Sequence, residues 1–250
     1  MNKNLWLLAL CQGLLLTNNV VFIAINGLVG LQLAPFGWMA TLPVMGYVVG
    51  GALSTPLVAA SQARWGRRAS FQLGLVVAFL SAALCAWAAF SASFWLLCAA
   101  TVIAGYYNAN GQLYRFAAAE LAAPSFREKA VSLVLAGGLI GAVAGPNLAS
   151  GTRTLFAIPF AGAYIALMLV ALLSMVCMAA VRFEDMAPPA PSAAAPPAGR
   201  SLGMLLRQPA FAVAVLGAAL GYGVMNLLMA ATPLAMQVCG FGFDAAALVL

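Results

Sequence analysis

The chain of 250 residues is 65% hydrophobic and 6% charged, with a formal net charge of +6 at pH 7. Its mean hydropathy is +1.03, whereas an ordinary soluble domain carries about 25% charged side chains. No soluble fold has enough interior to bury this much apolar surface, so the composition excludes a soluble globular domain and predicts a polytopic membrane protein.

The first apolar run, residues 5–33, is uncharged and longer than the core of a signal peptide, which predicts an uncleaved membrane-spanning helix. Pro35 and Gly37 follow this run and end the helix. Five further spans are expected before the composition changes, at residues 38–60, 69–90, 94–114, 130–151 and 155–181. Because helices satisfy their backbone polar groups internally, these runs predict an all-α fold.

The composition changes abruptly after residue 181. Residues 182–208 are rich in proline and alanine, which predicts a cytoplasmic linker with a short interfacial helix over 201–207. A seventh span is expected at 209–238, and Asp244 is expected to open an eighth helix that is too short to cross a bilayer by residue 250. The predicted organisation is therefore a six-helix N-terminal transmembrane bundle (1–181), the linker, and an incomplete C-terminal bundle (209–250). The chain is either truncated, the interpretation that we prefer, or a natural fragment.

A basic loop separates the second and third predicted spans. It holds Arg64, Arg67 and Arg68, and no charged residue lies between Ala69 and Tyr114. If the spans alternate across the membrane, all of the 11 Lys and Arg residues except Arg153 fall on one side. Cytoplasmic loops carry such an excess, which predicts a cytoplasmic N-terminus. We expect a multi-pass protein of the bacterial inner membrane.

This arrangement of six spans, a linker and a restart resembles the major facilitator superfamily. Within the basic loop, Arg64-Trp65-Gly66-Arg67-Arg68 fits the basic-x-Gly-basic-basic end of that family's signature. The resemblance implies a fold of two six-helix halves and assigns the loop residues Arg64, Gly66, Arg67 and Arg68 to gating and topology. Ala59 and Ala63 stand where the family has glycine and aspartate, so the acid that would latch the cytoplasmic gate is missing.

Glycines recur every four residues in the fifth predicted span, at Gly137, Gly141 and Gly145, and Pro146 follows them. Small residues let helices approach closely, and proline removes a helical hydrogen bond, so these four residues are candidates for helix packing or gating. The run from Gly141 to Pro146 resembles a glycine-proline signature of exporters in the superfamily. Its usual Gly-Gly ending is replaced by Ala149-Ser150, which weakens the implication of export.

Polar side chains at mid-span must pair with one another or line a wet cavity. The first span places Asn18 and Asn19 at its midpoint, with Asn26 on the same stripe as Asn19. The seventh span places Tyr222 and Asn226 near its midpoint, and we predict that both sets contribute to a substrate-binding site.

The fourth span adds a polar face of Asn108, Gln112 and Arg115, at positions i, i+4 and i+7. We predict that it offers amide and guanidinium donors to a solute. The alternative for each asparagine is interhelical hydrogen bonding, worth about 0.6 kcal/mol, with Arg115 anchored at the headgroups or paired with Glu120. Tyr47 in the second span is a further candidate for the cavity wall.

The leading functional hypothesis is a secondary active transporter that moves a small organic solute by alternating access, with export left open. The alternatives are a membrane receptor or scaffold that does not transport, and an inactive transporter fragment. No Asp or Glu lies within a complete span. Coupling to protons therefore stays open, through Glu120, Asp244 or a carboxylate elsewhere, as does facilitated diffusion.

Other classes of function are disfavoured by the residues themselves. The chain has no histidine, and its five cysteines lie in apolar stretches without metal-ligand spacing. No nucleophile–base constellation, phosphate loop or basic face is present, so we expect no enzyme, no metal, no cofactor and no nucleic-acid partner. The expected partners are a small-molecule substrate and the lipid bilayer, and we expect a monomer.

Overall fold

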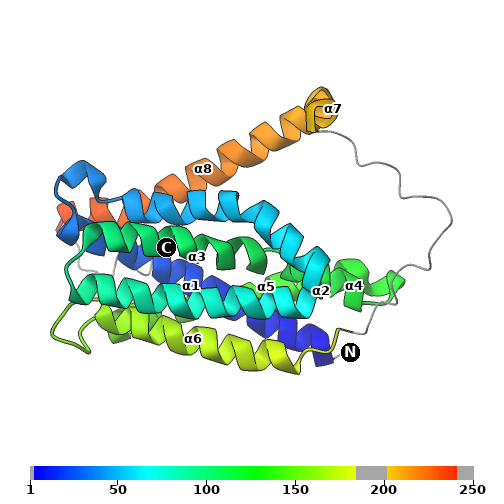
Figure 1. The fold of residues 1–250 in the computed structure, drawn as a ribbon, viewed down its shortest axis with the longest axis horizontal. Coiled ribbons are helices and arrows are strands. Elements are labelled where there is room, and N and C mark those ends of the chain that lie inside the picture. Colours follow the sequence, from blue (N-terminus) through cyan, green and yellow to red (C-terminus); the bar gives the residue numbers. More distant parts are fainter. Residues whose placement is uncertain (1–2, 184–201, 241–250) are drawn as a thin grey trace. The chain divides into compact units, whose positions relative to one another are not determined.

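A computed structural model of the chain describes residues 3–183 and 202–240, and these residues are helical apart from short turns (Figure 1). The linker predicted between residues 184 and 201, and the eighth helix expected at Asp244, lie outside the described residues. The chain divides into two compact units, Met1–Phe183 with Ala230–Leu250, and Glu184–Met229. Each unit is considered by itself.

The first unit is a bundle whose helices run along one another (Figure 1). Its helices are α1 (Lys3–Leu33), α2 (Leu42–Phe90), α3 (Phe94–Gly111), α4 (Tyr114–Leu121), α5 (Arg127–Thr152) and α6 (Ala161–Ala180), with short 3-10 turns at Gly37–Met39 and Pro124–Phe126. Downstream lie α7 (Leu202–Leu206), within the predicted interfacial helix, and α8 (Pro209–Val238), which has the bounds predicted for the seventh span.

Five helical segments of the described chain are long and apolar enough to cross a membrane. They are Lys3–Leu33, Gly37–Phe90, Pro124–Thr152, Ala161–Ala180 and Pro209–Pro233. The all-α, membrane-type fold predicted from the composition is thereby confirmed. The second segment is 54 residues long and holds two of the predicted spans.

Those two spans meet at Gly66, where α2 breaks sharply and the chain reverses its direction (Figure 1). Gly66 has φ +77° and ψ 171°, a backbone conformation that residues with a Cβ rarely adopt. The basic loop predicted here is therefore a single-residue break, with Arg64 on one arm of α2 and Arg67 and Arg68 on the other.

The sixth span begins later than predicted, at Ala161 instead of residue 155. Pro159 disfavours helical geometry in the residue before it, and Phe160 adopts a left-handed conformation with φ +66°. The Phe160 amide donates to the carbonyl of Arg153 at 3.1 Å, which closes a turn ahead of α6. Apolar composition alone could not reveal this turn.

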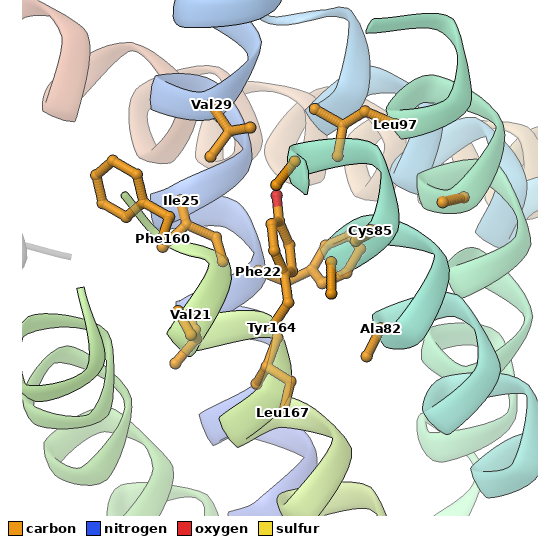
Figure 2. Packing of buried hydrophobic residues seen from close by; sticks show 14 of the residues in the cluster. Val21, Phe22, Ile25, Val29, Ala82, Cys85, Leu97, Phe160, Tyr164 and Leu167 are labelled. Atoms are coloured by element: carbon orange, nitrogen blue, oxygen red, sulfur yellow. The ribbon is translucent and has the colours of Figure 1, made fainter. Parts of the chain in front are cut away.

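Helix α1 lies at the centre of the bundle and contacts α2, α3, α4, α5 and α6. In its most apolar stretch 78% of the residues are buried, compared with 44% in α6. Figure 2 shows Phe22 and Ile25 of α1 packed among Tyr164 and Leu167 of α6, with Cys85 of α2 beside them. Because lipid tails are as apolar as these side chains, close packing holds the helices together.

Two helix pairs approach at backbone level through glycines. A Cβ at Gly137 of α5 would overlap the backbone of Ala9 in α1, and one at Gly141 would lie 2.6 Å from the carbonyl oxygen of Gly13. Between α2 and α3, a Cβ at Gly105 would overlap the backbone of Gly50. These contacts leave no room for a side chain.

The two remaining candidates in α5 also lie inside the bundle. A Cβ at Gly145 would lie 2.8 Å from the side chain of Val20 in α1. Pro146 is buried, and α5 continues past it to Thr152. The stripe predicted from sequence therefore faces α1 along several turns.

Candidate functional site

Four polar side chains from α1, α2 and α3 form one hydrogen-bonded network inside the bundle. The Tyr47 hydroxyl donates to Asn19 Oδ1, and Asn19 Nδ2 donates to Asn108 Oδ1 at 3.3 Å. Gln112 Nε2 donates to the same oxygen at 3.4 Å. We call these four residues, Asn19, Tyr47, Asn108 and Gln112, the amide network. Asn19 lies near the midpoint of α1.

An aromatic pair borders the amide network. The rings of Phe22 and Tyr47 are 4.7 Å apart between centroids and inclined at 38°. Asn19 and Gln112 are only partly buried, and within the described residues the carbonyl oxygen of Gln112 accepts no hydrogen bond. The arrangement therefore offers amide groups and ring surface to a polar, unsaturated solute.

The other two asparagines of α1 lie in different surroundings. Asn26 is fully buried, donates to the carbonyl of Phe22 at 2.7 Å and accepts from the Tyr164 hydroxyl at 2.8 Å. Its amide thus ties α1 to α6. The side chain of Asn18 is 6% exposed and makes no hydrogen bond within the described residues.

Arg115 does not continue the polar face of the fourth span as predicted. Helix α3 ends at Gly111, a turn at Gln112 and Leu113 follows, and Arg115 belongs to α4. Its side chain is exposed, with the guanidinium 5.1 Å from the ring centroid of Phe116. The turn interrupts the continuous helix on which the spacing of seven residues was based, and the amide network ends at Gln112.

The partner of Glu120 is Arg67 on the second arm of α2. Arg67 Nη2 donates to Glu120 Oε1, and Arg67 Nη1 donates to Gln62 Oε1 at 3.2 Å. Gln62 Nε2 in turn donates to Asn110 Oδ1 at 3.4 Å. Arg67 therefore links the two arms of α2 to α4, although Ala63 lacks the acid of the family signature.

Serines on both sides of the Gly66 break extend these contacts into the bundle. The hydroxyls of Ser61 and Ser70 are 2.6 Å apart, and Asn110 Nδ2 donates to the Ser70 carbonyl at 2.6 Å. Tyr106 donates to the Ser61 hydroxyl at 3.2 Å. Sequence reasoning missed this cluster, and its available signal was the pair of serines that flank the basic loop.

The other two arginines of the loop are oriented differently. The Arg64 guanidinium lies 5.8 Å from the ring centroid of Trp65. Arg68 Nη2 donates to the carbonyl of Ala179 in α6 at 2.8 Å. The loop thus contacts α4 through Arg67 and α6 through Arg68.

In the second unit, the predicted pair lies on one helical stripe of α8. Asn226 Nδ2 donates to the backbone carbonyl of Tyr222, one turn earlier, at 2.8 Å. The Tyr222 side chain is exposed. The contribution of both residues to a substrate site stays a prediction.

We expect the Arg67–Glu120 pair to contribute little to stability, because its side chains are 28% and 38% exposed. A double-mutant cycle with Arg67→Gln and Glu120→Gln, measured by thermal unfolding in detergent, should give a coupling energy of about 0.2–1 kcal/mol. Glu128→Gln, which removes an exposed acid at the start of α5, is the matched control. A coupling energy above about 2 kcal/mol would contradict a solvent-screened pair.

A bundle of membrane-length helices, with a polar network inside and a basic break at one end, defines a multi-pass integral membrane protein. Residues 5–250 match the family model described as Major Facilitator Superfamily. The chain belongs to this superfamily, a family of membrane transporters and not of enzymes.

Two curated proteins are similar to the chain in sequence. The chain is 34% identical over 252 residues to the riboflavin transporter RfnT of Brucella anthropi, covering 98% of this chain and 62% of that protein. It is 34% identical over 110 residues to YddS of Bacillus subtilis, an uncharacterized MFS-type transporter, covering 44% and 25% of the two chains.

A solved structure shares the fold. The crystal structure of a D-xylose–proton symporter matches with a TM-score of 0.63 at 19% identity, over 98% of this chain and 64% of that one. The chain therefore spans less than two thirds of the length of these relatives. Its helical arrangement corresponds to part of a larger transporter fold.

Proposed function

We propose that the chain is part of a secondary active transporter that moves a small polar organic solute by alternating access. Six spans would precede the linker, with the two arms of α2 counted as the second and third, and α8 would open the second bundle. The observation that carries this proposal is the amide network, which places four polar side chains among apolar helices of a superfamily member.

Riboflavin is the first solute to test, because RfnT is named a riboflavin transporter and is 34% identical to this chain. The flavin ring has an imide edge that both donates and accepts hydrogen bonds, as amide side chains do. Its flat ring also suits an aromatic neighbour such as the pair of Phe22 and Tyr47. In this proposal Asn19, Asn108 and Gln112 bind the polar edge of the solute.

Transport by the full-length protein in proteoliposomes tests the proposal. We expect labelled riboflavin to cross the membrane faster than in protein-free vesicles. Separate samples with the label outside or inside the vesicles report the direction of transport. An imposed proton gradient, collapsed by a protonophore in a parallel sample, reports whether protons are coupled. Binding without flux, for riboflavin and for a broad panel of solutes, would favour the receptor or scaffold.

We also propose that the N-terminus and the end of the bundle that holds the Gly66 break face the cytoplasm, in a bacterial inner membrane. The excess of basic residues on that side supports this orientation. A reporter fused before residue 1 should be active only in the cytoplasm. Activity on the opposite side of the membrane would reverse the proposed topology.

A further inference from the structure

A basic cavity lies where the N-terminal end of α1, the break in α2 and the C-terminal end of α6 meet, at one end of the bundle (Figure 1). Its volume is about 660 Å³. The residues that line it are Lys3, Asn4, Arg68, Ala179, Ala180 and Arg182. Three cationic side chains, from parts of the sequence that are far apart, thus border one space.

Neutral groups bind the backbone of Arg182 and the guanidinium of Arg68. Asn4 Nδ2 donates to the Arg182 carbonyl at 2.9 Å, and the Arg182 amide donates to Asn4 Oδ1 at 3.2 Å. Arg68 donates one hydrogen to the Ala179 carbonyl at 2.8 Å. A guanidinium has five N–H donors, so most of the donors of Arg68 are not used by this contact.

No carboxylate within the described residues neutralises the cavity. Glu120 pairs with Arg67, and neither residue lines the cavity. Lys3, Arg68 and Arg182 are all exposed. Three like charges around one space repel one another, and a bound anion would relieve that repulsion.

We infer that this cavity binds a phosphate group. Arginine presents paired N–H donors that match phosphate oxygens, and lysine adds a third positive charge. Arg68 belongs to the basic loop of the family signature, but the amide network does not reach this site. The site lies at the opposite end of α1 from Asn26 and does not depend on the solute that is transported.

The position of the cavity favours a phosphate carried by a lipid. The ends of membrane-spanning helices lie at the level of the headgroups, and basic pockets at that level bind anionic lipids. Ala179 and Ala180 are exposed beside the cations and give the cavity an apolar wall. Phosphatidylglycerol therefore fits better than free phosphate, which shares only the polar part of this chemistry.

Binding to the purified protein in neutral detergent tests the site. Phosphatidylglycerol should bind and raise the unfolding temperature, whereas phosphatidylcholine should do neither. The Arg68→Gln/Arg182→Gln double variant should bind phosphatidylglycerol about 30-fold more weakly. Arg64→Gln, which removes a cation of the same loop that does not line the cavity, is the matched control and should bind normally.

Further arms distinguish the remaining outcomes. Inorganic phosphate that protects as well as the lipid, at matched ionic strength and with the same loss in the double variant, would support the site with a free anion as its ligand. Arg68→Lys keeps the charge and should retain most of the binding. This variant tests the site even if the double variant misfolds.

Three results would overturn the inference. The first is equal binding of phosphatidylglycerol and phosphatidylcholine, and the second is an equal loss of binding in Arg64→Gln. The third is binding of phosphate or phosphatidylglycerol only after Glu184→Gln and Asp185→Asn, because these acids follow Arg182 in the sequence and would then already neutralise the cavity.

Discussion

Asn108→Leu is expected to reduce solute transport by at least about tenfold, because leucine removes the oxygen that accepts from both Asn19 and Gln112. Two amide N–H groups would lose their acceptor inside an apolar bundle, and the Asn19–Tyr47 pair would lose its connection to α3. The measurement is the initial rate of riboflavin uptake into proteoliposomes, normalised to the amount of folded protein.

Two further variants separate a role in binding from a role in folding. Asn147→Leu changes an exposed asparagine that donates to the Val143 carbonyl of its own helix and to no other group among the described residues, so uptake should be unchanged. Asn108→Asp keeps an acceptor oxygen and should lose less activity than Asn108→Leu. Normal uptake by a well-folded Asn108→Leu protein would remove the amide network from the proposed solute site.

Gly137→Ala is expected to destabilise the bundle by about 1–3 kcal/mol, the usual cost of overpacking. The new Cβ would overlap the backbone of Ala9, and neither α1 nor α5 can move without disturbing the neighbouring contact at Gly141. Alanine is the better helix former by about 1 kcal/mol, so any loss of stability must come from packing. Thermal unfolding in detergent measures the effect.

Gly151→Ala on the same helix is the matched control. Its Cβ would meet no atom within 4 Å, and the position is exposed. The unfolding temperature of this variant should be unchanged or slightly higher. If the two variants unfold at the same temperature, α1 and α5 are not held at backbone contact, and the glycine stripe would be free to act in gating.

The positions of most helices could be predicted from the sequence. The seventh span was predicted at residues 209–238 and α8 has those bounds, because a long apolar run between polar ends defines a membrane-spanning helix. The sixth span was wrong at its start, where Pro159 and Phe160 form a turn within an apolar stretch. Hydropathy does not distinguish an apolar turn from an apolar helix.

Site residues could be predicted less well. The mid-span position of Asn19, Asn26 and Asn108 indicated polar residues that need partners, but not which partners. Asn26 pairs with Tyr164, from which it is 138 positions away in sequence, whereas Asn19 pairs with Tyr47 and Asn108. The predicted face ending at Arg115 assumed one continuous helix, and the turn after Gly111 removes that assumption.

The sequence by itself determined that the chain is an all-α membrane protein, where most of its spans lie, and which loop carries the basic charge. These properties depend on local composition, since a span must be apolar over its own length. Only the tertiary structure decided that Arg67 meets Glu120, that Arg68 reaches Ala179, and that one network joins α1, α2 and α3. Such contacts depend on which helix faces meet, and Arg68 and Ala179 are 111 positions apart in the chain.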